Sequence, residues 1–476
     1  MIYKDFKAYQ ASGFQPKVCI VGGGPAGISL ALRLAAKRIP CVLLEAGGRT
    51  YDAEVQAAYN GKVIGDNYFE LGSSRLRYLG GSTGHWQGWC RALDAIDFEA
   101  RKGVPNSGWP IRKTDLDPYA SEADRLLDLP TAKPDQALSA DLQEIEFRFS
   151  KPIVRFGDKY AAELEKSPLI AVALNSPVID LVPVRGRIAE ARIGQAGAAA
   201  ASLKAPAYAL CTGGIENSRL LLWANQQHQG GVVPEARTLG KYWMEHPHYT
   251  LGQAALFTFT GFRTPGGMHF YAPTADYLRK HAIGSFGVRL LSGENLIKAL
   301  IKDGLCVAPE IFTDFAKKAS KDLACAAALH VAWEQLPQES NRIELGSDKD
   351  AWGMARSVLH WRKQPVERTT ADHAVRLVGS YLAGSDKGRV KVSDWLLKNQ
   401  AYPLDDEQAG FHHMGGTRMA ASPEQGVVDA NCKVFGVDNL YVGGSSVFPT
   451  GGHTNPTYSI VQLALRLGDH LAGRAL

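Results

Sequence analysis

The stretch "CIVGGGPAGISLALRLAAKRIPCVLLEAGG", residues 19–48, decides the fold of this chain. The run "KVCIVGGG" is rich in β-branched residues and predicts a buried parallel strand. The next segment, "PAGISLALRLAAKR", has the apolar spacing of a helix, and "PCVLLEAGG" predicts a second buried strand. Gly22-x-Gly24-x-x-Gly27 therefore stands at the first turn of a β-α-β unit, where dinucleotides bind.

Each glycine of this motif has its own task. Gly22 permits the tight turn, Gly24 lets the backbone approach a pyrophosphate, and Gly27 lets the helix pack closely on the strand. Pro25 and Ala26 begin the helix, whose N-terminal amides and dipole favour phosphate. We therefore expect the pyrophosphate of a dinucleotide at this turn.

An acidic residue follows the second strand. Glu45, 18 residues after Gly27 and directly before Ala46, can accept hydrogen bonds from ribose hydroxyls and would repel a 2′-phosphate. The motif alone does not separate NAD from FAD.

The composition excludes several classes of protein. With 476 residues, 45% of them apolar and 21% charged, the chain is expected to be soluble and to form two or three domains. A net charge of +5 without any run of Lys or Arg argues against nucleic acid. The longest apolar stretches, such as "LACAAALHVAW" (323–333), are too short to span a membrane, and the N-terminus has no apolar signal segment. Seven widely spaced cysteines without a CxxC pair predict reduced thiols, a cytoplasmic location and no metal site.

Three further segments separate the two cofactors. They are "RYLGGSTGHWQGWCRALDAIDFE" (77–99), "APAYALCTGGIENSRLLLWAN" (205–225) and the C-terminal stretch 410–471, which contains "FHHMGGTRM", "NLYVGGSSVFPT" and "GGHTNPT". Together with the N-terminal motif they resemble the glucose-methanol-choline (GMC) oxidoreductases, a family of flavoenzymes. "GKYWMEHPH" (240–248) and "EQLPQESNRIELGSDKDAWG" (334–353) are most similar to the branch of pyranose oxidases and glycoside 3-dehydrogenases.

The resemblance implies an α/β fold of two parts. A Rossmann-type FAD-binding domain is built from discontinuous segments, and an α+β substrate domain contributes an antiparallel sheet. We expect the FAD-binding domain over 1–130, its continuation with an insertion over 131–250, the substrate domain over 251–400, and the last FAD-binding part over 401–476. Within the substrate domain, "QAALFTFTGFR", "AALHVAWEQL" and "RIELG" predict strands, with helix around 292–320. The Ala-rich stretch 194–206 is expected to be a loop.

The resemblance also implies FAD as the cofactor and assigns further residues to its site. Small residues at strand-to-helix turns would let the chain lie against a flat ring system. The residues assigned to FAD outside the N-terminal motif are Gly80, Gly81, Ser82, His85, Trp86, Gly213, Gly444, Asn455, Pro456 and Thr457.

His85 has two interpretations. "GGSTGHWQG" resembles the "STHW"-like segment through which some pyranose oxidases bond the flavin covalently, but Gly84 stands where that segment has Thr. His85 either carries this bond or packs beside a flavin that is held without one.

The resemblance places the chemistry on His412 and Asn455. Oxidation of an alcohol by a flavin requires a base for the hydroxyl proton, and imidazole suits this task because it titrates near neutrality. His412 stands at the position of the family's active-site histidine, and Asn455 stands where the family has the His or Asn paired with it. His413 is the competitor for the base; it would otherwise be a core histidine bonded to a carbonyl. His453 could also reach the pocket.

Four other residues are open to more than one interpretation. Arg75 and Arg77 could contact the charge of the cofactor or of a phosphate, but we expect them to form ion pairs at the surface. Strand alternation puts His330 and Glu334 on one face, where they could line the pocket or belong to core and surface.

The expected function is FAD-dependent oxidation of a secondary alcohol, a sugar or glycoside hydroxyl at ring carbon 2 or 3, to a ketone. Hydride would pass to flavin N5 and then, as electrons, to oxygen, a quinone or a carrier protein. Two alternatives are a GMC-fold natural-product tailoring enzyme or lyase acting on another alcohol, and a non-catalytic flavin-binding electron-transfer subunit. The apolar residues of 292–306 could form a contact surface between copies of the chain, so a homo-oligomer is possible.

Overall fold

The N-terminal motif folds as the sequence predicts. In this computed structural model, which describes residues 1–195, 198–257, 268–292, 325–404 and 410–474, "VCIV" forms strand β2 (Val18–Val21), all four residues of which are buried. Helix α2 (Pro25–Ala36) follows with proline at its first position, and β3 (Cys41–Leu44) returns parallel to β2. The predicted β-α-β unit is therefore present.

Strands β2 and β3 lie at the centre of a six-stranded sheet assembled from distant parts of the chain. Its order is β1-β9-β3-β2-β13-β21, and every neighbouring pair is parallel. The other four strands are β1 (Ile2–Tyr3), β9 (Ile170–Ala173), β13 (Ala207–Leu210) and β21 (Leu440–Val442). The FAD-binding domain is thus built from discontinuous segments, as predicted.

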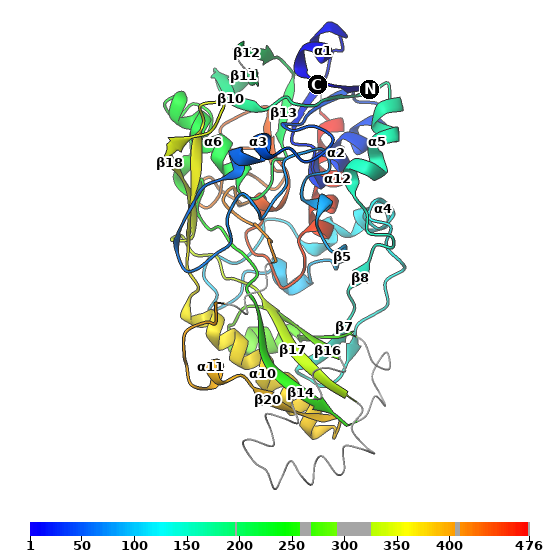
Figure 1. Cartoon of the computed structure of the whole chain (residues 1–476), viewed down its shortest axis with the longest axis vertical. Helices are drawn as coiled ribbons and strands as arrows, with labels where there is room; N and C mark the ends of the chain where they lie inside the picture. Colours follow the sequence, from blue (N-terminus) through cyan, green and yellow to red (C-terminus); the bar gives the residue numbers. More distant parts are fainter. Residues whose placement is uncertain (196–197, 258–267, 293–324, 405–409, 475–476) are drawn as a thin grey trace.

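Helices cover this parallel sheet. The C-terminal helix α12 (Thr457–Ala472) packs against α2, although more than 400 residues separate them (Figure 1). The other helices of this part are α1 (Phe6–Ala11), α3 (Ala53–Gln56), α4 (Ala120–Leu126), α5 (Phe156–Lys166) and α6 (Glu216–Gln227). The strands are rich in β-branched residues, and their burial beneath these helices forms the larger of the hydrophobic cores.

A second, seven-stranded sheet occupies the other end of the molecule, in the lower half of Figure 1. It is antiparallel throughout, in the order β20-β14-β17-β16-β15-β7-β6. The long helix α10 (Pro365–Gly384) packs on one face and closes a separate core. The strands are β6 (Gln136–Ala137), β7 (Leu142–Ile145), β14 (His248–Leu256), β15 (Met268–Pro273), β16 (Phe286–Ser292), β17 (Cys325–Trp333) and β20 (Gly388–Val392).

Smaller sheets complete the fold. Strands β10 (Val178–Val184), β11 (Arg187–Gln195) and β12 (Ala198–Leu203) form an antiparallel sheet. The loop expected over 194–206 was therefore wrong for 194–195, which end β11, and for 198–203, where backbone pairing with β11 makes the alanine run a strand. The remaining elements are β4 (Lys62–Gly65), β5 (Trp89–Cys90), β8 (Arg148–Phe149), β18 (Arg342–Lys349), β19 (Ala355–Trp361), α7 (Ala275–His281) and α11 (Asp394–Leu397).

Three predictions fall wholly or partly outside the described residues. Only residue 292 is described of the helix around 292–320 and of the apolar residues of 292–306, and residues 258–263 of the strand predicted for "QAALFTFTGFR" are not described. Within the described ranges, none of the helices has both the length and the apolar character that crossing a bilayer requires.

Candidate active site

A cavity of about 630 Å³ lies between the two large sheets. One wall comes from turns at the carboxyl ends of the parallel strands, including Gly24 after β2, Glu45 after β3 and Gly213 after β13. The other wall comes from the seven-stranded sheet, including His248 of β14 and Arg289 of β16. This is where open parallel sheets place their ligands.

The three motif glycines have the geometry that their tasks require. Gly22 has φ +106°, and a Cβ there would stand 2.5 Å from the Cys211 carbonyl oxygen. A Cβ on Gly27 would stand 2.0 Å from the carbonyl oxygen of Gly22, so this glycine permits helix–strand packing and does not line the cavity. A Cβ on Gly24 would meet nothing within 4 Å, because that position faces the cavity.

Glu45 is bound by the turn itself. Its two carboxylate oxygens accept from the amides of Gly23 and Gly47, each at 2.8 Å. Burial raises the pKa of Glu45, and these amides oppose the shift. The carboxylate lines the cavity with acceptor sites to spare, so its contact with a ribose stays a prediction.

Most of the other predicted cofactor residues also line the cavity. They are Gly22, Pro25, Ala26, Ala46, Gly81, Ser82, His85, Trp86, Gly213, Gly444, Asn455, Pro456 and Thr457. Gly80 does not: its amide donates to the Gly23 carbonyl at 2.8 Å, and a Cβ on it would meet the Gly157 nitrogen at 2.6 Å. Gly80 therefore joins segments behind the cavity wall.

The cavity suits an FAD molecule. No side chain caps α2 at Gly24, so the amides of its first turn are available to phosphate. Gly24 and Gly213 both leave open space over the backbone. At the opposite end, His248 Nε2 and His453 Nε2 are buried without a hydrogen-bond partner among the described residues. Such atoms are free to bond a ligand or a water in the cavity.

His412 and Asn455 meet at this end of the cavity. The Asn455 side-chain nitrogen lies 3.0 Å from His412 Nε2, and His412 Nδ1 lies 2.9 Å from His246 Nδ1. If Asn455 donates, Nε2 is the unprotonated nitrogen and Nδ1–H donates to His246, which is the tautomer a base requires. The predicted pair is therefore brought together, with His246 as a third member that the sequence did not indicate.

A buried glutamate positions these rings. Glu245 Oε1 accepts from the backbone amides of His246 and His412, at 2.8 and 2.7 Å. Its other oxygen accepts from the Tyr68 hydroxyl, and that hydroxyl lies 3.0 Å from His413 Nε2. His413 thus bonds to a tyrosine and not to a carbonyl, and it lines the cavity alongside His412.

The histidines are held neutral. Burial lowers the pKa of His412 well below its usual value, and the neighbouring His246, His248 and His413 lower it further. Burial likewise lowers the pKa of His246 to about 4 and that of His413 to about 3. A neutral imidazole is the form that accepts a proton.

His85 and Trp86 lie on the same wall. The ring of His85 stacks on Phe411 with centroids 6.0 Å apart and planes 19° apart. Trp86 Nε1 donates to the Val154 carbonyl at 2.7 Å, which fixes the indole.

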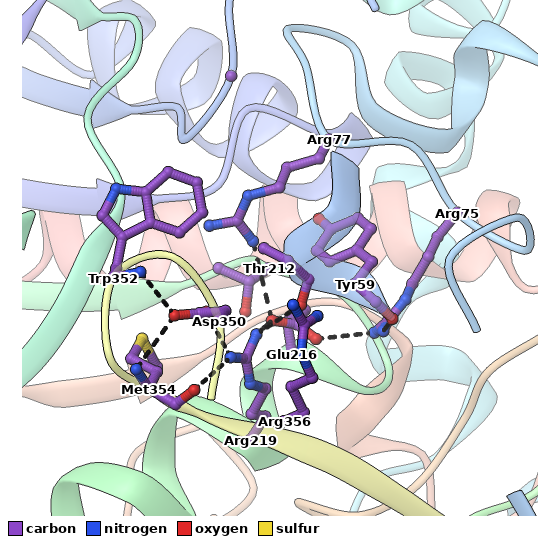
Figure 2. Close-up of polar contacts among 12 residues, drawn as sticks. Tyr59, Arg75, Arg77, Thr212, Glu216, Arg219, Asp350, Trp352, Met354 and Arg356 are labelled. Carbon is purple, nitrogen blue, oxygen red and sulfur yellow. Dashed lines mark hydrogen bonds and ion pairs between the residues drawn. The ribbon is translucent and has the colours of Figure 1, made fainter. Parts of the chain in front are cut away.

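The expectation of surface ion pairs for Arg75 and Arg77 was wrong. Figure 2 shows Arg75, Arg77 and Arg219 converging on Glu216, each from a different direction. Arg75 lies 3.0 Å from Glu216 and is 7% exposed, and Arg219 also pairs with the buried Asp350 at 2.5 Å. The network joins α6 to the turn between β18 and β19. Its charged residues come from distant segments of the chain and meet in the interior.

His330 and Glu334, which strand alternation was expected to put on one face, lie in different surroundings. His330 lines the cavity, but Glu334 lies beyond the end of β17 and forms a bidentate pair with Arg101, 2.8 Å to each oxygen. His453, which lines the cavity, contacts the Ser285 hydroxyl at 2.8 Å.

Sequence reasoning missed Glu245, His246, His248 and Arg289. The alternation "EHPH" at the start of β14 was the available signal, since residues 246 and 248 share a face.

Comparisons with known proteins agree with this geometry. The sequence model of the GMC oxidoreductases matches residues 337–464, the segment that carries His412 and Asn455. The 2-methyl-1,2-propanediol dehydrogenase of Mycolicibacterium austroafricanum is 24% identical over 97% of this chain and 96% of its own. The C-glycoside 3-oxidase of Microbacterium trichothecenolyticum is 30% identical, over 28% of this chain and 25% of its own.

Among solved structures, pyridoxine 4-oxidase from Mesorbium loti superposes with a TM-score of 0.59 at 16% identity, over 96% of this chain and 99% of its own. This likeness shows the fold. The C-terminal family match, the near full-length relative and the shared fold agree: residues 337–464 match the GMC oxidoreductases, a family of FAD-dependent enzymes, and the whole chain is similar to them.

Proposed function

We propose that this enzyme uses FAD to oxidise a secondary alcohol to a ketone, and that the alcohol is a sugar or glycoside hydroxyl at ring carbon 2 or 3. The observation that carries the proposal is the contact of Asn455 with His412 Nε2 inside a buried cavity. The local similarity to a C-glycoside 3-oxidase supports the sugar class.

FAD would be held by the β2–α2 turn, by Glu45 and by the turns at Gly213 and Gly444. When bound, it supplies the acceptor for the hydride that leaves the carbinol carbon.

The protein supplies the base and the geometry. The substrate hydroxyl would replace the Asn455 amide as the donor to His412 Nε2 and would itself accept from that amide, which orients the carbinol hydrogen. Glu245 fixes the His412 backbone, and His246 fixes the ring through Nδ1. His412 is buried, which strengthens these polar contacts.

Anaerobic mixing with a methyl glycoside tests the proposal. We expect the flavin absorbance near 450 nm to bleach in the parent enzyme. His412→Ala removes the base and should slow bleaching by about 10²–10⁴-fold while flavin stays bound. Asn455→Ala should slow it less than His412→Ala, and Asn455→His should restore part of the rate, because a ring N–H can replace the amide donor.

His360→Ala is the matched control, since that ring lies outside the cavity beside Glu344. Bleaching of His412→Ala at the parent rate would contradict the role of His412. A flavin that stays oxidised with every alcohol tried would favour a lyase or a non-catalytic subunit.

A further inference from the structure

Arg289 occupies the cavity face of the seven-stranded sheet. In β16 its cross-strand neighbours are His330 on β17 and Phe270 on β15, and all three line the cavity. The alternate residues Val288 and Leu290 point the other way, into the core beneath α10. Strand alternation therefore fixes the direction of the Arg289 side chain.

No carboxylate among the described residues pairs with Arg289. Its Nε is buried without a hydrogen-bond partner there, and its guanidinium lies 5.1 Å from the centroid of the Trp89 ring. Two buried arginines elsewhere have acidic partners, Arg101 with Glu334 and Arg219 with Asp350, whereas the buried Arg418 donates to the Asn106 carbonyl. Burial lowers the pKa of the half-buried Arg289, and no carboxylate of the described residues opposes the shift, so its charge is held at some loss of free energy.

The neighbouring imidazoles carry no charge to compete with it. Burial lowers the pKa of His330 to about 4, helped by Arg289, and lowers that of His248 well below its usual value. The rings step from His330 to His248 and from His248 to His412, with centroids 5.7 Å apart in each step. Arg289 and His412 thus line the same cavity, with the rings of His330 and His248 between them.

Aromatic side chains flank the guanidinium. Trp89 and Phe147 both line the cavity and both contact Phe270, with ring centroids 5.5 and 5.0 Å apart. These faces suit an apolar or ring-shaped body next to the charge.

We propose that the substrate alcohol carries a carboxylate that pairs with Arg289 while its hydroxyl meets His412 and Asn455. The inference rests on the proposed function and adds the charge of the substrate to it. A carboxylate is favoured because one guanidinium matches one monoanion through two parallel hydrogen bonds. A phosphate dianion usually recruits more than one cation.

Binding of benzoate and of its neutral analogue benzamide to the flavin-loaded enzyme, measured by calorimetry at pH 7.5, tests the inference without turnover. We expect the parent to bind benzoate roughly 10- to 100-fold more tightly than benzamide, as for a hydrogen bond to a charged group. Arg289→Gln should remove this preference. Arg289→Lys should keep part of it, because an ammonium supplies the charge without the planar fork.

Arg376→Gln is the matched control, because that arginine pairs with Asp372 on the outer part of α10. It should leave both dissociation constants unchanged. If Arg289→Gln does not retain flavin, Arg289→Lys carries the comparison and must bind benzoate more weakly than the parent does.

Equal affinity of the parent for benzoate and benzamide would overturn the inference, as would equal losses of both in the variants. Tighter binding of phenyl phosphate than of benzoate would overturn the choice of carboxylate. These results are separate from bleaching by alcohols, so the inference can fail while the proposed function stands.

Discussion

The ring of His412 lies among other imidazoles. Glu245 binds the backbone amides of His246 and His412 and not their rings, so among the described residues no observed contact places a carboxylate on the His412 ring. A proton taken from substrate would therefore be held in an unfavourable environment. His246, 2.9 Å away at Nδ1, is the neighbour placed to share it. The arrangement favours a base that takes up a proton only during turnover.

The residue before His85 bears on the covalent bond. A Cβ on Gly84 would stand 1.8 Å from the Tyr78 hydroxyl, so the Thr of the family segment would require the Tyr78 side chain to move. Because the local packing differs and His85 stacks on Phe411, we expect flavin held without a bond. Acid precipitation should leave the yellow colour in the supernatant of parent and His85→Ala alike. Colour that stays with the parent pellet but not with the variant pellet would contradict this.

At the scale of elements, the β2–α2 turn separates cofactor contact from packing. A Cβ on Gly24, at φ −82°, enters open cavity, so Gly24→Ala should fold normally but retain less flavin. A Cβ on Gly27 collides with the Gly22 carbonyl oxygen, so Gly27→Ala should lose about 1–3 kcal/mol of unfolding free energy. The ratio of flavin to protein absorbance and urea unfolding measure the two effects. A full flavin content in Gly24→Ala would contradict the assignment.

The same elements show how far the sequence could lead. The strand–turn–helix pattern around Gly22 is local, so its geometry could be predicted before any tertiary contact was known. His412 and Asn455 were predicted only through motif resemblance. The burial of Arg75 and Arg77 could not be predicted from the sequence, because Glu216 and Asp350 come from distant segments.

At the scale of the molecule, one sheet holds the cofactor turns and the other covers them. The seven-stranded sheet brings His248, Arg289 and His330 to the far side of the cavity. Their position depends on strand order and register, which no motif in 251–400 indicates. The division of the chain at residues 130, 250 and 400 stays a prediction.

The closure of one sheet over the other also predicts acid sensitivity. His246, His330 and His413 have pKa values lowered by burial to about 4, 4 and 3, whereas an unfolded histidine titrates near pH 6.5. The unfolded chain therefore binds more protons between these values, and the unfolding free energy falls as the pH drops below about 6.5. Each histidine contributes up to about 1.4 kcal/mol per pH unit. Urea unfolding at pH 7.5 and 5.0 should show a steep loss that His330→Gln reduces and His360→Gln does not; equal slopes in parent and His330→Gln would show that His330 takes up its proton without unfolding.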